Sequence, residues 1–268
     1  MNLLKFIDKY SADERPETSA PADNSRRSAF RKMGGFARDL AMVGLPVTAA
    51  VLTPRRVFAQ TGDSVADVLN FALTLEYLEA EYYQNGLDTD GLLTGDTRDV
   101  IAQISKHEDQ HVEFLKTAIG SLGGTPVDKP DFDFTAGGTF ADVYSNPATF
   151  MALSQAFEDT GVRAYKGQAG NLITAPDILT AALQIHSVEA RHASQIRRMR
   201  GSKGWIVQAN NTTGAAPADA VYAGEGQTTQ LGVDVSTVTS VGSDGITEAW
   251  DEPLAKDDVL AIASLFLA

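Results

Sequence analysis

Two short motifs of the form Glu-x-x-His are the residues of this chain best suited to chemistry. They read EDQH at residues 108–111 and EARH at residues 189–192, and both lie in stretches with the apolar spacing of a helix. Positions three apart are neighbours on one helix face, so each motif presents a carboxylate and an imidazole in the same direction. Two such helices facing each other would supply the two halves of a site for two metal ions.

Chance is a weak explanation for two such motifs. The chain has only four His and twelve Glu among 268 residues, so a Glu three positions before a given His is about a one-in-twenty accident. A single motif would be interpreted as an ion pair on a helix surface. Because two of the four His satisfy the pattern, a shared metal site is favoured instead.

Each motif is preceded by another helical stretch that carries a Glu on its apolar face. Glu76 and Glu79 interrupt the apolar spacing of residues 65–83. Glu158 interrupts the apolar spacing of residues 150–165 in the same way. A carboxylate buried alone costs several kcal/mol, so each of these side chains must be paired, hydrogen-bonded or bound to a metal.

The two halves of the chain share one register. Tyr83 follows Glu76 by seven residues, and the same spacing separates Tyr165 from Glu158. Glu76 lies 32 residues before the Glu of the first motif. Glu158 lies 31 residues before the Glu of the second. This repetition predicts two equivalent helical hairpins.

The register also distinguishes two neighbouring carboxylates. Gly161 stands in the second half where the first half has Glu79. Glu158 stands where the first half has Glu76. We therefore expect Glu76 to be the carboxylate that the first helix contributes to the site, with Glu79 as the alternative or as an additional ligand.

One Glu from each of two helices, together with Glu-x-x-His from each of two others, resembles the ligand set of the ferritin-like di-iron and di-manganese carboxylate proteins. The resemblance covers about residues 64–200. Within that family the chain looks most like exported ferritin-like proteins related to the plant desiccation-related proteins, which the DEPL run at residues 251–254 also resembles. The chain has no Cys, which excludes the cysteine-bound iron site of rubrerythrin-type members.

The resemblance implies six ligands for two iron or two manganese ions. They are Glu76, Glu108, His111, Glu158, Glu189 and His192. Glu108 and Glu189 would be the bridging carboxylates, and each His would bind one ion. Tyr83 and Tyr165 resemble the tyrosines that hydrogen-bond close to such sites, and they are expected, with Glu79, to lie next to the ligands.

The predicted ligand set is compatible with more than one function. The resemblance implies O2 or hydrogen peroxide as the small-molecule substrate of an oxidoreductase of ferroxidase, peroxidase or catalase type. The alternative is a non-catalytic ferritin-like stress or structural protein of the cell envelope, without an occupied metal site. His107 and His186 are core or surface residues on one interpretation and supports of the ligands on another. The oligomeric state, a homo-oligomer included, stays open.

Residues 1–59 are predicted to be a signal segment for export. Arg26 and Arg27 precede thirteen mostly apolar residues at 40–52, which is the length of a signal core and too short to span a bilayer. Val57 and Ala59, two small residues just before Gln60, would suit cleavage. The paired Arg predict the twin-arginine route, which carries folded proteins to the periplasm or another extracytoplasmic space. The alternative is an uncleaved N-terminal arm with a short buried helix.

Charge and composition exclude several other functions. The chain holds 22 basic and 35 acidic residues, of which ten and six lie in residues 1–59. The expected mature chain therefore keeps 12 basic and 29 acidic residues, a formal charge of −17, which argues against nucleic acid as a partner. We expect no membrane span there. The absence of Cys excludes disulfides and thiol catalysis, and no Gly-x-Ser-x-Gly motif supports a serine hydrolase.

These patterns predict an all-α, ferritin-like four-helix bundle over residues 60–201. The first helix is expected to begin near Asp63, as its N-cap, and to end just before Asn85-Gly86. The others are expected from Thr94 or Asp96 to Ser121, from Asn146-Pro147 to about Ala169, and from residues 174–177 to Gly201. Residues 123–146 contain Pro, Gly and three Phe, and are expected to cross the length of the bundle between helices 2 and 3. Residues 202–268 are expected to form an irregular extension that wraps the bundle, contains a small strand pair and ends in a short helix.

Overall fold

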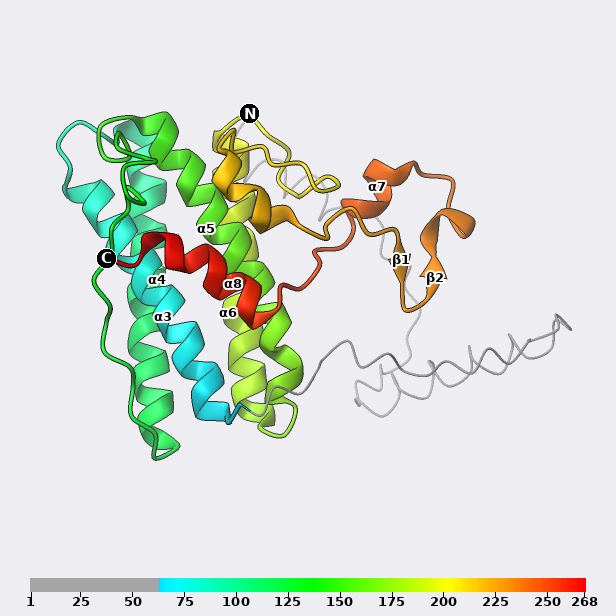
Figure 1. Cartoon of the computed structure of the whole chain (residues 1–268), viewed down its shortest axis with the longest axis horizontal. Coiled ribbons are helices and arrows are strands. Elements are labelled where there is room, and N and C mark those ends of the chain that lie inside the picture. The colour runs from blue at the N-terminus through cyan, green and yellow to red at the C-terminus, as the bar shows by residue number, and fades with distance from the viewer. Residues whose placement is uncertain (1–62) are drawn as a thin grey trace, which may run out of the picture. The chain divides into compact units, whose positions relative to one another are not determined.

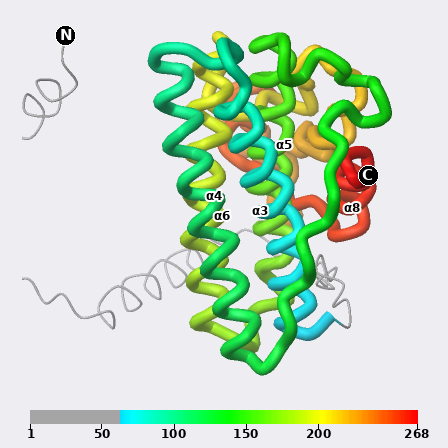
Figure 2. Tube along the Cα trace, turned by 90° about the vertical axis from the view of Figure 1, so that its left-hand side faces the viewer, coloured from blue at the N-terminus to red at the C-terminus, as the bar shows by residue number. Residues whose placement is uncertain are grey.

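The computed structural model of the protein describes residues 63–268, where four long helices dominate (Figure 1). They are α3 (Val65–Asp88), α4 (Gly95–Ser121), α5 (Pro147–Gln168) and α6 (Pro176–Met199). α3 packs mainly against α4 and α5 against α6, and the two hairpins stand side by side as a bundle (Figure 2). The predicted all-α four-helix bundle is confirmed. The predicted signal segment lies outside the described residues.

α3 begins one residue later than predicted. Ser64 caps the helix, because its hydroxyl accepts a hydrogen bond from the Asp67 backbone N–H at 3.2 Å. The Asp67 carboxylate in turn accepts from the Ser64 backbone N–H at 2.9 Å, which completes a capping box. Asp63, the predicted cap, accepts instead from Lys256 Nζ at 2.7 Å.

The end of α3 was predicted wrongly. The helix continues through Asn85 and Gly86 to Asp88 instead of stopping at this pair. Gly86 is buried against Phe150, and a Cβ at this position would lie 2.3 Å from the Phe150 Cε2 atom. The glycine thus permits close packing between α3 and α5, and it does not mark a turn.

The remaining helix ends agree with the sequence to within two residues. α4 follows Thr94 and ends at Ser121. α5 begins at Pro147 after Asn146, whose side chain accepts from the Ala148 N–H at 3.0 Å. α5 is extended by a short 3-10 helix, η2 (Ala169–Leu172).

The predicted crossover between α4 and α5 runs along the bundle (Figure 2). Two of its three Phe, Phe134 and Phe140, are buried. Its backbone also binds the far end of the chain, since the Asp133 N–H donates to the Phe266 carbonyl at 2.8 Å. The crossover is therefore held both by its aromatic side chains and by the C-terminal residues.

The C-terminal extension contains more regular structure than predicted. Its elements are η3 (Ala216–Tyr222), β1 (Thr229–Gln230), β2 (Val233–Asp234), η4 (Val235–Thr237), α7 (Ser243–Thr247), α8 (Lys256–Ala263) and η5 (Ser264–Phe266). β1 and β2 form the expected small antiparallel pair. α8, the expected final helix, packs on the bundle, whereas α7 and the strand pair lie beside it (Figure 1).

One buried arginine of α5 holds this extension. Arg163 Nε lies 2.7 Å from a carboxylate oxygen of Glu225 and donates to the Glu252 carbonyl at 2.7 Å. Its two remaining nitrogens donate to the carbonyls of Val221 and Ala223. A planar guanidinium can satisfy several acceptors at once, so a single side chain fixes two separate segments of the extension, residues 221–225 and Glu252.

A second buried ion pair joins α5 to α6. Arg197 is 2% exposed, and it binds both carboxylate oxygens of Asp159 at 3.0 and 2.6 Å. The Tyr222 hydroxyl donates to the same carboxylate at 2.8 Å. Every one of these polar groups is therefore paired, which makes the burial of the charges tolerable.

Two hydrophobic clusters fill the interior of the bundle. The aromatic cluster is built of Leu78, Tyr82, Tyr83, Leu92, Leu93, Ile101, Ile104, Phe134, Phe140, Val143, Phe150, Met151, Leu153, Phe157, Ile196 and Phe266. The aliphatic cluster is built of Val68, Leu69, Ala72, Leu73, Val112, Leu115, Ala118, Ile119, Tyr165, Leu172, Ala182 and Ile185. Along each helix the members of one cluster come before those of the other, so the clusters occupy opposite ends of the bundle.

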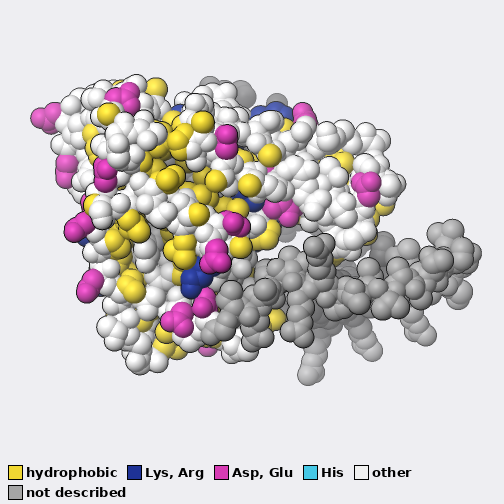
Figure 3. Space-filling model, viewed as in Figure 1, with side chains coloured by type: hydrophobic (Ala, Val, Ile, Leu, Met, Phe, Trp, Pro, Cys, Tyr) yellow, Lys and Arg dark blue, Asp and Glu magenta, His cyan; other side chains and the backbone are white. Residues whose placement is uncertain are grey.

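The surface in Figure 3 is mainly acidic among its charged side chains. Asp and Glu side chains are scattered over the described part of this face, and Lys and Arg are fewer. Within residues 63–268 no helix has both the length and the apolar character needed to cross a membrane.

Candidate metal centre

A layer of four carboxylates separates the aromatic and aliphatic clusters. Each long helix contributes one of them, and all are 0–1% exposed. They are Glu76 of α3, Glu108 of α4, Glu158 of α5 and Glu189 of α6. Each lies where its helix passes from one cluster to the other, so four acidic groups meet in the middle of an apolar interior.

The first Glu-x-x-His motif faces carboxylates from three helices. His111 Nδ1 lies 3.0 Å from Glu108 Oε2, its own motif partner. It also lies 3.2 Å from Glu76 Oε2 and 3.2 Å from Glu189 Oε1. One ligand atom from each of these four residues lies within 4.8 Å of the other three, which is the spacing of donors around a single ion.

The second motif forms a group of the same kind. His192 Nδ1 lies 3.0 Å from Glu108 Oε1 and 3.2 Å from Glu158 Oε2. It lies 3.9 Å from Glu189 Oε2. These four residues again offer donor atoms within 4.8 Å of one another. Glu108 and Glu189 belong to both groups, which is the arrangement required of bridging carboxylates.

The two tyrosines bind the carboxylates reciprocally. Tyr83 of α3 donates to Glu158 Oε1 on α5 at 2.5 Å. Tyr165 of α5 donates to Glu76 Oε1 on α3. Each tyrosine thus orients the carboxylate of the other hairpin, which the seven-residue spacing within each helix did not show.

Glu79 lies beside the centre without joining either group of donors. It is 4% exposed and faces Gly161. A Cβ on Gly161 would lie 3.4 Å from Glu79 Oε1 and 3.3 Å from Glu189 Oε2. The glycine leaves room for an additional carboxyl group next to Glu189, and burial raises the pKa of Glu79 with a contribution from the Glu189 charge.

Without metal, the centre holds protons. Burial raises the pKa of Glu108, helped by the charge of Glu189. Burial also raises the pKa of Glu158, to about 7. Although burial opposes charge on the imidazoles, their carboxylate neighbours raise the pKa of both His111 and His192. Glu189 is buried as well, but these two imidazoles lower its pKa to about 2.

The polar atoms at the centre are not satisfied by the protein alone. Five buried atoms of the centre make no hydrogen bond of good geometry to residues 63–268, although they approach carboxylate or imidazole atoms to within 3.0–3.9 Å. They are Glu108 Oε1, Glu158 Oε2, both carboxylate oxygens of Glu189, and His192 Nδ1. Native interiors leave few buried polar atoms unpaired, and each needs an explanation such as an ion. The orphaned atoms are carboxylate oxygens and an imidazole nitrogen, so the donors fit two divalent transition-metal ions.

His107 is a residue whose role the sequence left open. Its Nδ1 lies 2.9 Å from His192 Nε2, and the two rings stack at 5.1 Å and 10°. Its own Nε2 lies 2.7 Å from Gln103 Nε2. His107 therefore fixes the ring nitrogen of His192 that faces away from the carboxylates. The signal in the sequence was its position four residues before His111, on the same face of α4.

His186 does not contact the centre. Its Nδ1 donates to the Val162 carbonyl at 3.0 Å, which ties α6 to α5. Of the two histidines outside the motifs, one thus touches a predicted ligand and the other serves the packing of the helices.

The fold and the buried layer of carboxylates and imidazoles define a four-helix bundle with a candidate di-metal centre. The chain matches a family model described as "Ferritin-like domain" over residues 64–202, which contains all four long helices. Because the match covers more than half of the chain, the protein belongs to the ferritin-like domain family. No curated protein matches it. The six predicted ligands lie together at the centre, and their role as ligands stays a prediction.

Proposed function

We propose that the protein binds two iron or two manganese ions in this centre and reacts with O2 or hydrogen peroxide there. The observation that carries the proposal is the pair of overlapping donor groups, each with one imidazole and three carboxylates, in which five buried atoms make no hydrogen bond of good geometry. Buried polar groups of this kind are costly unless something binds them. A purely structural role would leave that cost without a benefit.

Charge and donor type favour redox metals. Four ionised carboxylates balance two divalent ions, so the loaded centre is neutral and suited to burial. Mixed carboxylate and imidazole donors suit iron and manganese, which can change oxidation state. When bound, two such ions together supply the two electrons that reduce O2 to the level of peroxide or peroxide to water.

The protein's own groups would prepare the site for this chemistry. Tyr83 and Tyr165 hold the outer carboxylates in place through their hydroxyl groups. His107 fixes the orientation of the His192 ring. Supports of this kind around a ligand set commonly change metal affinity 10–100-fold when removed. The two hydrophobic clusters surround the centre with apolar side chains on both sides.

Metal analysis of protein purified without chelators tests the proposal. We expect close to two ions per chain and a large loss in the variants Glu108→Ala and His192→Ala, since Glu108 contributes to both donor groups. Glu113→Gln is the matched control, because Glu113 lies on the same helix with an exposed side chain paired to Lys116. Less than about half an ion per chain, unchanged in the variants, would instead support a non-catalytic ferritin-like bundle.

Two further measurements refine the proposal. Anomalous scattering at the iron and manganese absorption edges identifies the ion at each position. Assays of ferrous oxidation and peroxide consumption on loaded protein then separate a ferroxidase from a peroxidase or catalase. A protein that retains its ions but consumes neither oxidant would be a metal-binding protein without turnover.

We also propose export by the twin-arginine route, supported by Arg26, Arg27 and the apolar run at residues 40–52. A folded substrate of that route can acquire its metal before crossing the membrane. The test is cell fractionation with mass spectrometry of the mature N-terminus. Export should be lost in the variant with both Arg26 and Arg27 replaced by Lys. An unprocessed chain that stays inside the cell would contradict it.

A further inference from the structure

The aliphatic end of the bundle contains an apolar pocket that none of the proposed chemistry uses. Side chains from all four long helices line it, among them Val68, Leu69, Leu115, Ile178 and Ile185. Phe114 also lines the pocket and is 42% exposed, so the pocket reaches the surface.

The inner end of this pocket adjoins the candidate metal centre. Ala72 and Ile185 line it, and each precedes a predicted ligand by four residues: Glu76 and Glu189. Four residues of helix span about 6 Å, so the lining comes within one turn of the carboxylates. Tyr165 completes the contact, because its ring lines the pocket and its hydroxyl donates to Glu76.

The size of the cavity restricts its occupant to a very small molecule. The cavity measures about 20 Å³, whereas one water-sized molecule needs roughly 10–15 Å³. An aromatic ring or an acyl chain does not fit. A diatomic gas does.

The lining also disfavours water. A buried water needs two to four polar partners, and the polar side chains that line this pocket are those of Tyr165 and Gln168. The Tyr165 hydroxyl is already bonded to Glu76, and Gln168 Oε1 accepts from Asn171 at 2.9 Å. Cavities lined almost wholly by apolar side chains stay dry and bind apolar gases.

We propose that this pocket, which we call the apolar channel, binds dioxygen and delivers it to the centre from the aliphatic end of the bundle. The proposal rests on the function proposed above and adds the path of the substrate. A polar oxidant such as hydrogen peroxide would gain nothing from the apolar channel, because its hydrogen bonds to water would be lost there.

Xenon is the probe that tests binding independently of any metal. Crystals of the protein as purified, pressurised with xenon, should show an anomalous peak in the apolar channel. In the variant Ala182→Leu that peak should disappear, because the larger side chain fills the channel. Ala182 lies seven residues before Glu189, so the substitution is two turns away from the ligands. Ile178→Ala widens the channel and should raise the occupancy of xenon there. This second variant tests the proposal if Ala182→Leu does not fold.

Kinetics on metal-loaded protein tests delivery. In Ala182→Leu the rate constant for reaction with O2 should fall about fivefold or more, because the larger side chain blocks the path to the centre. The rate with hydrogen peroxide and the metal content should stay unchanged.

A matched control fills a different hollow near the centre. Ala263 of α8 lines a smaller cavity of about 10 Å³ that borders Glu79 and Gly161. Ala263→Leu should leave the O2 rate unchanged. Three results would each overturn the proposal. The first is an ordered water in the channel, and the second is the absence of a xenon peak. The third is an O2 rate that responds to Ala263→Leu and not to Ala182→Leu. Failure of the proposed function would look different, since the protein would bind xenon but no metal.

Discussion

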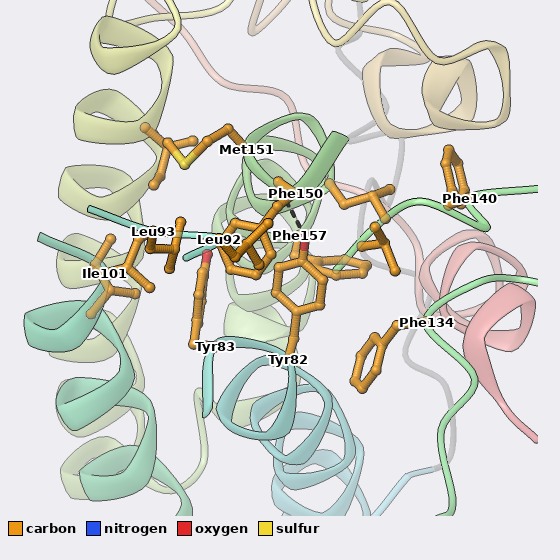
Figure 4. Packing of buried hydrophobic residues seen from close by; sticks show 14 of the residues in the cluster. Tyr82, Tyr83, Leu92, Leu93, Ile101, Phe134, Phe140, Phe150, Met151 and Phe157 are labelled. Carbon is orange, nitrogen blue, oxygen red and sulfur yellow. Dashed lines mark hydrogen bonds between the residues drawn. The ribbon is translucent and has the colours of Figure 1, made fainter. Parts of the chain in front are cut away.

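The two ends of the bundle contain the same kinds of helix, yet they pack differently. At the aromatic end the Tyr82 ring stacks on Phe150 at 4.6 Å and 7° and meets Phe157 edge-on at 4.8 Å (Figure 4). The Tyr82 hydroxyl also donates to the Phe150 carbonyl at 2.7 Å. At the aliphatic end, branched and small side chains such as Leu69 and Ala182 leave a pocket that reaches the surface.

The difference shows how a layer of predicted ligands can be covered by tightly packed rings on one side and adjoin a pocket on the other. Large rings in fixed mutual geometry fill space completely and add stability through their contacts. Aliphatic side chains of mixed size leave small voids that apolar gases can occupy. The sequence repeat makes the two hairpins alike, but it does not make the two ends of the bundle alike.

The largest expected effect is at the aromatic end. Phe150→Ala should lower the free energy of unfolding by about 3–5 kcal/mol, because it removes a fully buried ring that packs on Tyr82 and Gly86. Urea unfolding of metal-free protein measures it. Leu69→Ala is the comparison at the aliphatic end, where we expect a smaller loss. Equal losses would show that the two ends are packed to the same quality.

Removing one tyrosine hydroxyl at a time compares the two ends at the carboxylate layer itself. Tyr83→Phe and Tyr165→Phe should each cost about 1–3 kcal/mol in metal-free protein, since each leaves a buried carboxylate oxygen without its donor. Thermal or urea unfolding measures the loss. Only Tyr165→Phe should also alter the reaction of the loaded protein with O2, because only Tyr165 lines the apolar channel. The same kinetic change in both variants would contradict this distinction.

The next effect concerns the support of one ligand. His107→Ala should weaken metal binding about 10–100-fold, the usual result of removing the hydrogen-bond partner of a metal-binding His. Competition with a coloured chelator measures the affinity. His186→Ala is the matched control, because that imidazole binds a backbone carbonyl away from the centre. If the metal affinity of His107→Ala were unchanged, the contact between His107 and His192 would contribute only to packing.

The smallest expected effect is a dependence of metal affinity on pH. Metal binding requires deprotonated ligands, and the metal-free centre holds protons because the pKa of Glu158 is raised to about 7 and those of His111 and His192 are raised too. Raising the pH from about 6 to 8 takes Glu158 through its pKa, so loss of its proton should raise the affinity about tenfold over this range. Calorimetry in buffers of different ionisation enthalpy counts the protons. An affinity independent of pH would refute it.

Much of the fold was predictable because helices are encoded locally. The spacing of apolar residues and the Asn146-Pro147 pair located the helices to within two residues at most of their ends. Gly86 is the exception, since the same residue type marks turns and close helix contacts, and only Phe150 on another helix decides between them. Among the short helices of the extension, α8 was expected and the others were not. One of those others, η3, is held from outside the extension, since its Val221 carbonyl accepts a hydrogen bond from Arg163 of α5.

As with the fold, the features of the site that lie within one helix were predictable, and the contacts between helices were not. The sequence by itself determined which residues could be ligands, because carboxylates on apolar helix faces and the spacing i, i+3 follow from one helix at a time. It also determined that two hairpins repeat. The tertiary structure alone decided that Tyr83 and Tyr165 bind across the hairpins, that His107 meets His192, and that a pocket opens at one end. These contacts depend on the rotation and axial offset of neighbouring helices, which no pattern within a single helix contains.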